Sequence, residues 1–225
     1  MRSERLLILW LAIVSAGFIA QAQGTFQNLG FESANVSGYP PGGIPATNAI
    51  PGWTAYLGQF QSTQMLYNTV SLGSPAISIH DAASSYLPIL GNYSVILQST
   101  PGGPSLTSSV GQIGQIPSSA MSLIFYGSSL QVSFNGQPLA ITQLGSSPAY
   151  SILGADISAF GGQTGELKFS LPNFSFGAMS YLDNIQFSNQ PIPEPSVLGL
   201  LALGALLLGL RFIKAQIKKG SLGRG

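Results

Sequence analysis

Short apolar runs, each closed by Gly, Pro, Ser or Asn, recur throughout residues 23–190. The sequence contains 28 Gly and 15 Pro, which interrupt helices and favour turns. No stretch of this region keeps the period that an amphipathic helix requires. The pattern predicts about a dozen short strands, at residues 25–31, 53–57, 64–70, 76–80, 93–98, 106–113, 121–126, 130–134, 138–142, 150–153, 167–171 and 181–187.

These strands predict an all-β fold, in which two antiparallel sheets pack as a sandwich with jelly-roll connectivity. The clearest hairpin is expected at Asn135-Gly136, because this dipeptide suits the two positive-φ positions of a type I′ turn. The chain contains no Cys, so an ordinary apolar core must stabilise the sandwich. Length and the absence of internal repeats predict one domain, at residues 23–190.

Charged residues make up only 7% of the chain, which argues against a basic nucleic-acid-binding surface. Their distribution along the chain is uneven. Residues 23–195 contain one Lys and six acidic residues, whereas residues 211–225 contain five basic residues and no acidic one. This asymmetry predicts a weakly acidic exported body and a basic tail that faces a membrane.

The N-terminus has the three parts of a secretory signal peptide, predicted at residues 1–22. A charged start is followed by an apolar run at residues 6–20 and by Ala20-Gln21-Ala22. Small residues at these two alanine positions suit cleavage after Ala22. The alternative, an uncleaved anchor helix, agrees less well because the run is shorter than the roughly 20 residues of a membrane span.

A second apolar run, at residues 197–210, is followed directly by Arg211 and the basic tail. Its 14 residues would reach only ~21 Å as a helix, which is too short to cross the hydrocarbon core of a bilayer. The predicted transmembrane helix therefore takes in the flanking residues and extends over about residues 196–213. Because positive charge stays on the cytoplasmic side, residues 23–195 would lie outside the membrane. Pro193-Glu194-Pro195 precedes this helix, and its prolines keep the chain extended there.

The order of Pro193-Glu194-Pro195, a short apolar helix and a basic cluster that starts at Arg211 resembles the sorting tail of the PEP-CTERM family. The resemblance covers residues 191–225. It implies a Gram-negative bacterial substrate of an exosortase, exported through the inner membrane and transiently anchored there by its tail. The body would then reach the cell surface or extracellular matrix. The alternative is a plain C-terminal anchor behind a Pro-rich stalk.

Two segments of the body resemble carbohydrate-binding-like jelly-roll domains. Residues 26–32, followed by Pro51-Gly52-Trp53, are similar to the opening of these domains, and residues 181–187 are similar to their closing strand. The resemblance implies a jelly-roll fold and does not by itself imply a ligand.

The residue types needed for catalysis are scarce. His80 is the only His and adjoins Asp81, but neighbouring strand residues point to opposite faces of a sheet and cannot easily form a dyad. Asp81, Asp156 and Glu166 could supply the carboxylate pair of a glycosidase, although nothing in the sequence sets their separation. We therefore expect that the protein is not an enzyme, and a glycan-active enzyme is the least favoured alternative.

Three aromatic side chains are candidates for a glycan-binding surface, because sugar rings stack on flat aromatic faces. Trp53, Tyr56 and Tyr67 lie close together in the sequence. The alternative for Trp53 is a structural role at the end of the sandwich. The leading functional hypothesis is a non-catalytic exported surface or matrix protein that contacts exopolysaccharide, and the second hypothesis is a dedicated glycan-binding module.

Asp183 predicts a structural cation site. In a regular strand Asp183 shares one face with Tyr181, Ile185 and Phe187, and a buried charge must be compensated. The resembled jelly rolls often join their terminal strands through Ca²⁺, which implies a site held by Glu32 and Asp183. The alternative is a local bulge that turns Asp183 to solvent or to backbone N–H groups.

Overall fold

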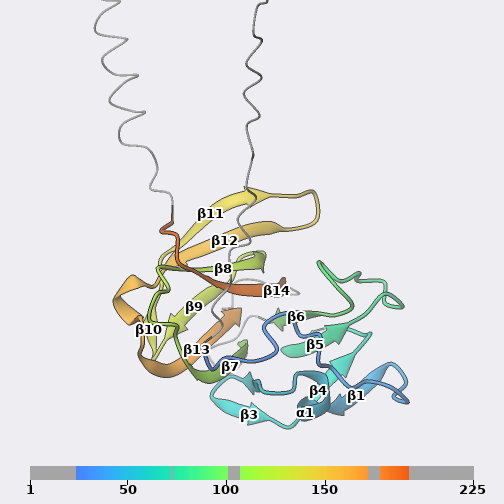
Figure 1. Ribbon diagram of the computed structural model, residues 1–225. Coiled ribbons are helices and arrows are strands. Elements are labelled where there is room, and N and C mark those ends of the chain that lie inside the picture. Colours follow the sequence, from blue (N-terminus) through green and yellow to red (C-terminus); the bar gives the residue numbers. More distant parts are fainter. Residues whose placement is uncertain (1–23, 72, 101–106, 172–177, 193–225) are drawn as a thin grey trace, which may run out of the picture.

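The computed structural model describes residues 24–71, 73–100, 107–171 and 178–192, and it consists of two β-sheets packed face to face (Figure 1). The eight-stranded sheet has the order β1 (Gly42–Pro45), β4 (Gln64–Tyr67), β5 (Ala76–His80), β6 (Ser94–Ser99), β14 (Ala178–Ser188), β8 (Ser122–Gly127), β12 (Ser151–Asp156) and β11 (Ile141–Ser146). The six-stranded sheet has the order β10 (Gln137–Pro138), β9 (Gln131–Phe134), β13 (Thr164–Leu171), β7 (Ser108–Gln115), β2 (Thr54–Leu57) and β3 (Phe60–Ser62).

Within the described part of the chain, every strand pair is antiparallel except β4 and β5, which are parallel. Helical structure there is limited to α1 (Ala46–Ala49) and a short 3₁₀ turn, η2 (Ser158–Phe160). The predicted all-β sandwich of two sheets is therefore confirmed. No helix among these residues is long and apolar enough to cross a membrane.

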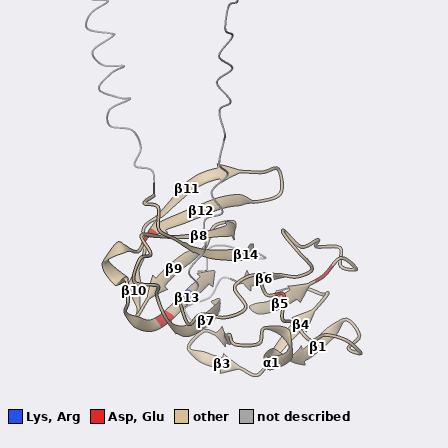
Figure 2. Ribbon diagram, viewed as in Figure 1, with Lys and Arg blue, Asp and Glu red and all other residues tan. Residues whose placement is uncertain are grey.

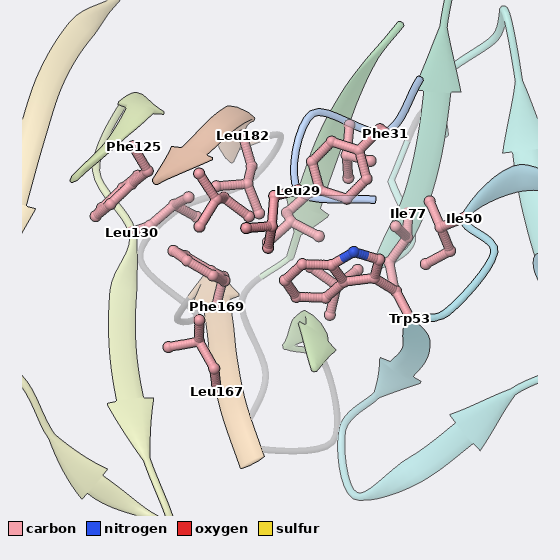
Figure 3. Close-up of a cluster of buried hydrophobic side chains, with 14 of the residues drawn as sticks. Leu29, Phe31, Ile50, Trp53, Ile77, Phe125, Leu130, Leu167, Phe169 and Leu182 are labelled. Atoms are coloured by element: carbon pink, nitrogen blue, oxygen red, sulfur yellow. The ribbon is translucent and has the colours of Figure 1, made fainter. Parts of the chain in front are cut away.

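Alternation along the strands builds the core between the sheets (Figure 3). Leu167, Phe169 and Leu171 of β13 are buried there, while Glu166, Lys168 and Ser170, which alternate with them, are half-exposed on the outer face. This period of two is what a strand with one buried face requires. The predicted hairpin at Asn135-Gly136 is also confirmed: these residues have φ of 49° and 76°, and they join β9 to β10.

The strand predicted at residues 25–31 is wrong. The segment forms turns, and Asn28 and Phe31 adopt left-handed φ values of 51° and 60°, which a strand does not allow. Its apolar residues Phe26, Leu29 and Phe31 are nevertheless buried in the core. The segment therefore closes one end of the sandwich without pairing as a strand.

Part of the eight-stranded sheet is covered on its outer face as well. Ile79 and Val95 point into the core, yet their neighbours His80 and Ser94, which point away from it, are also fully buried. The loop at residues 81–93 covers them: Tyr86 packs edge-on against His80, and the backbone N–H of Ile89 donates to Ser94 Oγ. This loop buries one end of β5 and β6 on the outer face, and toward the other end the N–H of Ser71 donates to Gln98 Oε1 of β6 at 2.8 Å.

The predicted targeting segments lie outside the described residues. They comprise the signal cleavage site at Ala20 and Ala22, the motif Pro193-Glu194-Pro195, and the apolar helix with Arg211. The described chain ends at Ile192, whose side chain packs over Gly154 on β12. These targeting predictions therefore stay predictions.

Candidate functional site

Trp53 lies in the core rather than on a binding surface (Figure 3). Only 5% of the side chain is exposed, and its ring packs against Phe31 and Phe169 with centroid distances of 5.6 and 6.1 Å. The indole N–H donates to the carbonyl of Asn28 at 3.1 Å. No face of the ring is left for a sugar, so Trp53 has the structural role given above as the alternative.

Tyr67 is buried too, and its hydroxyl is already engaged. It donates to Asp81 Oδ2 at 2.7 Å, while Asn68 Nδ2 donates to Asp81 Oδ1 at 2.7 Å. The hydrogen bond to Asp81 and burial together raise the pKa of Tyr67 to about 12. Burial alone would raise the pKa of Asp81, but the bonds from Tyr67 and Asn68 outweigh it and hold that pKa below 3.8. Tyr67 therefore stabilises the start of the loop at residues 81–93 and does not stack on a ligand.

Tyr56 is the one predicted aromatic that remains half-exposed, on the outer face of the six-stranded sheet. Its hydroxyl donates to Glu166 Oε1 at 2.9 Å, and Lys168 Nζ lies 4.0 Å from the centre of its ring. Burial, followed by the bond to Glu166, raises the pKa of Tyr56. One face of this ring is thus covered by an ammonium group, a cation–π contact.

The carboxylate of Asp183 is compensated by hydrogen-bond donors. A bulge in β14 beyond Asp183 changes the strand register, so Asp183 points away from the core whereas Ile185 and Phe187 point into it. The expectation that these residues share one face is wrong. Asp183 Oδ2 accepts from Leu90 N at 3.0 Å and from Ser94 Oγ at 2.7 Å, and Oδ1 accepts from Asn184 N at 2.6 Å.

Glu32 lies near Asp183, but its carboxylate oxygens accept hydrogen bonds from other donors. Its carboxylate accepts from the backbone N–H groups of Asn92 and Tyr93 and from Asn92 Nδ2, at 2.9 to 3.2 Å. N–H groups aimed at both carboxylates leave them poorly suited to the oxygen cage that Ca²⁺ requires. Among the described residues no group of three or more acidic or His side chains could hold a metal ion. The donor set of Glu32 and Asp183 thus does not suit the predicted cation, and N–H and O–H groups take its place.

Burial raises the pKa of Asp183 to about 6, despite the three hydrogen bonds that favour its charged form. The nearby negative charge of Glu32 adds to this rise. Asp183 is 1% exposed, and the described residues contain only one Lys and no Arg. The fold therefore carries a buried carboxylate without a positive partner.

In the described part of the chain, the predicted catalytic candidates lie apart from one another. His80 is fully buried, with Nδ1 2.6 Å from Ser84 Oγ and Nε2 2.8 Å from Ser78 Oγ, and burial lowers its pKa to about 4. Asp81 is bound to Tyr67 and Asn68 instead. Asp156 accepts from Ser158 N on the eight-stranded sheet, whereas Glu166 lies on the other sheet, so these carboxylates do not form a pair.

Sequence reasoning missed a group of tyrosines on the outer face of the eight-stranded sheet. Tyr126 of β8 and Tyr150 stack with ring centres 5.0 Å apart and 14° between their planes. Tyr126 is the register partner of Asp183 on β14, and Tyr181 projects two residues away on the same side of that strand. All three rings are half-exposed. We call the surface formed by Tyr126, Tyr150 and Tyr181 the tyrosine face.

The tyrosine face is apolar between its rings, since Ile124 and Ile152 project beside Tyr126 and are also half-exposed. No carboxylate or ammonium group is exposed among the described residues that form it. The outward position of Tyr126 in the alternating strand at residues 121–126 was the only sequence signal for this surface. The other two rings of the tyrosine face are distant from Tyr126 in the sequence: Tyr150 directly precedes β12, and Tyr181 belongs to β14.

No protein-family model matches this chain, and no curated protein matches it. Solved structures with similar traces include a carbohydrate-binding module, TmCBM61, in complex with β-1,4-galactotriose: 14% identity, 73% of this chain and 97% of that chain covered, TM-score 0.42. Another is the Stig cyclase Fisc from Fischerella sp. TAU, with 14% identity, coverage of 76% and 98%, and a TM-score of 0.43. Similarity at this level does not indicate a ligand or an activity for this protein.

Proposed function

We propose that this protein is an exported, non-catalytic surface or extracellular-matrix protein whose β-sandwich binds polysaccharide through the tyrosine face. The observation that carries the proposal is the half-exposed stack of Tyr126 and Tyr150 beside Tyr181 on the outer face of the eight-stranded sheet. Flat aromatic rings pair with the apolar C–H faces of sugar rings, and rigid tyrosines lose little conformational entropy when they do so. The three rings carry no charge, and the exposed carboxylate of Asp156 lies four residues from Ile152 along β12, which favours a neutral polysaccharide at the rings themselves.

The non-catalytic part of the proposal is supported by where the titratable side chains lie and by the hydrogen bonds that they form. His80 is buried as a neutral side chain, and Asp81 and Asp156 are each engaged in local hydrogen bonds. General acid–base catalysis needs a second titratable group positioned beside the first, and none is placed beside the exposed Asp156 among the described residues. Turnover of any polysaccharide that Glu166→Gln abolishes would overturn this part.

Export and sorting are proposed from the sequence alone. The exosortase and the inner membrane would be the partners of the tail, and exopolysaccharide the partner of the body. If Pro193-Glu194-Pro195 is the recognition motif, replacing it by three alanines leaves full-length protein in the membrane of the native host, because the apolar run can still insert. Release of the mutant body at the normal rate would exclude the motif.

A glycan array with the purified protein tests the binding proposal. We expect saturable binding of a neutral polysaccharide, and we expect Tyr126→Ala and Tyr150→Ala each to weaken it about tenfold, the scale of one lost aromatic contact. Tyr39→Ala is the matched control, since Tyr39 is an exposed tyrosine on a distant loop. Equal affinities of the wild type and both tyrosine-face variants would overturn the site.

A further inference from the structure

The six-stranded sheet carries a hollow of about 470 Å³ beside its edge strand β10. The chain leaves this sheet here, because the next strand, β11, belongs to the eight-stranded sheet. The lining comes from β9, the turn at Gly136, β10 and the start of β11, together with Ser170 of β13. The volume is within the range of small-molecule sites, roughly 300–1,000 Å³.

Three polar side chains of the lining lie on the outer face of this sheet. Gln131 of β9 and Ser170 of β13 are cross-strand partners, and Ser133 lies two residues beyond Gln131. They alternate with Val132 and Phe169, which point into the core. Within the described part of the chain, no hydrogen bond uses these three side chains. The hollow therefore has hydroxyl and amide groups that are free to bind a ligand.

The rest of the lining is apolar and uncharged. Pro138 is exposed, and Leu139 and Ile141 are half-exposed. No lining residue is charged, and charged side chains are sparse throughout the described residues (Figure 2). The ammonium group of Lys168 on β13 lies over the ring of Tyr56 on β2 instead. The hollow thus offers neutral hydrogen-bonding groups and apolar surface, and it offers no partner for an ionised ligand.

A neutral sugar ring matches this combination. Its hydroxyl groups both donate and accept hydrogen bonds, as do serine hydroxyls and the amide of glutamine. Its C–H groups can contact apolar side chains such as Pro138 and Leu139. A carboxylate or ammonium group of a ligand would lose its hydration here without gaining an opposite charge, which is unfavourable.

We propose that this hollow is a second carbohydrate site, which binds one neutral sugar ring. Gln131, Ser133 and Ser170 bond the hydroxyl groups of the ring, while Pro138 and Leu139 contact its C–H groups. The site lies on the outer face of the six-stranded sheet, whereas the tyrosine face belongs to the other sheet. It therefore goes beyond the proposed function and does not depend on it.

Calorimetric titration of the full-length protein with neutral trisaccharides of glucose, galactose, mannose, xylose and N-acetylglucosamine tests the proposal. The protein is used as the Tyr126→Ala/Tyr150→Ala variant, so that the tyrosine face does not contribute. We expect saturable binding of at least one trisaccharide, with an affinity that does not change with salt, because no charged group lines the hollow. Absence of binding to all five, or an affinity that falls as salt rises, would overturn the proposal.

Further variants, made in the same background, place the ligand. Ser170→Leu fills the hollow and should abolish binding, whereas Thr164→Leu, the same kind of change on an exposed position of β13 outside the hollow, should not affect it. Gln131 is exposed, so Gln131→Ala should fold normally and lose about fivefold in affinity, the scale of one neutral hydrogen bond. Unchanged binding by Ser170→Leu or by Gln131→Ala would show that the hollow is not the site.

The tyrosine face and the hollow can fail separately. Binding that is lost in the Tyr126→Ala/Tyr150→Ala variant but kept in Ser170→Leu with both tyrosines present would assign the sugar to the tyrosine face and overturn the hollow. Binding that is lost only in Ser170→Leu and Gln131→Ala would support the hollow and contradict the tyrosine face.

Discussion

Asp183→Asn removes a buried negative charge while keeping the size of the side chain and an oxygen that can accept the bonds from Leu90 and Ser94. The pKa of Asp183 is about 6 in the folded protein against an ordinary value of 3.8, so the folded state binds more protons than the unfolded chain between these values. Stability from this group therefore rises as pH falls. Between pH 7 and pH 4.5 the gain is about 2 kcal/mol.

His80 has the opposite effect over the same range. Burial lowers its pKa from 6.5 to about 4, so the unfolded chain binds the additional proton and acid destabilises the fold. From pH 7 to pH 4.5 the loss is also about 2 kcal/mol. The two contributions nearly cancel, and the wild-type free energy of unfolding should change by less than about 1 kcal/mol over this interval.

Urea unfolding followed by tryptophan fluorescence, at several pH values in the presence of EDTA, measures this balance. We expect Asp183→Asn to lose about 2 kcal/mol between pH 7 and pH 4.5, because His80 is then unopposed. Asp156→Asn is the control: the pKa of Asp156 is already below 3.8, so this variant should keep the flat wild-type profile. A flat profile for Asp183→Asn would refute the cancellation.

Three further predictions concern stability. Trp53→Ala should cost about 3–5 kcal/mol in urea unfolding, since it empties a packed core position, and any loss of glycan binding in this variant would then reflect unfolding. Gly127→Ala should cost about 1–3 kcal/mol because its Cβ would collide with the backbone carbonyl of Tyr181. Gly145→Ala, whose Cβ would have its nearest neighbour at 3.5 Å, should cost less than half as much. EDTA and Ca²⁺ should leave the melting temperature unchanged, and a rise with Ca²⁺ would show that a cation displaces N–H donors at Asp183.

Local patterns in the sequence determined the fold class. The alternation of Leu167 and Phe169 with Lys168 is a period of two that only a half-buried strand satisfies, and Asn135-Gly136 provides the backbone freedom that a two-residue hairpin needs. Both signals act within a few residues. For this reason most predicted strands lie where the structure has strands.

Failures of the sequence patterns occur where the local signal is ambiguous. Residues 25–31 have strand-like composition, but tertiary packing of Phe26 and Phe31 at the end of the sandwich prevails over pairing. Trp53 and Tyr67 carry the same signal whether they stack on a ligand or fill a core. Only their neighbours in the fold decide between these roles.

The candidate sites were decided by sheet order. Because β14 lies between β6 and β8, Asp183 meets Ser94 on one side and Tyr126 on the other (Figure 1). Gln131 lies beside Ser170 because β13 pairs with β9. A strand's own sequence sets which side chains share a face, but the choice of neighbouring strand depends on long-range packing, which no local pattern records. The sequence by itself determined the two-sheet fold, and only the tertiary structure decided which of its side chains meet.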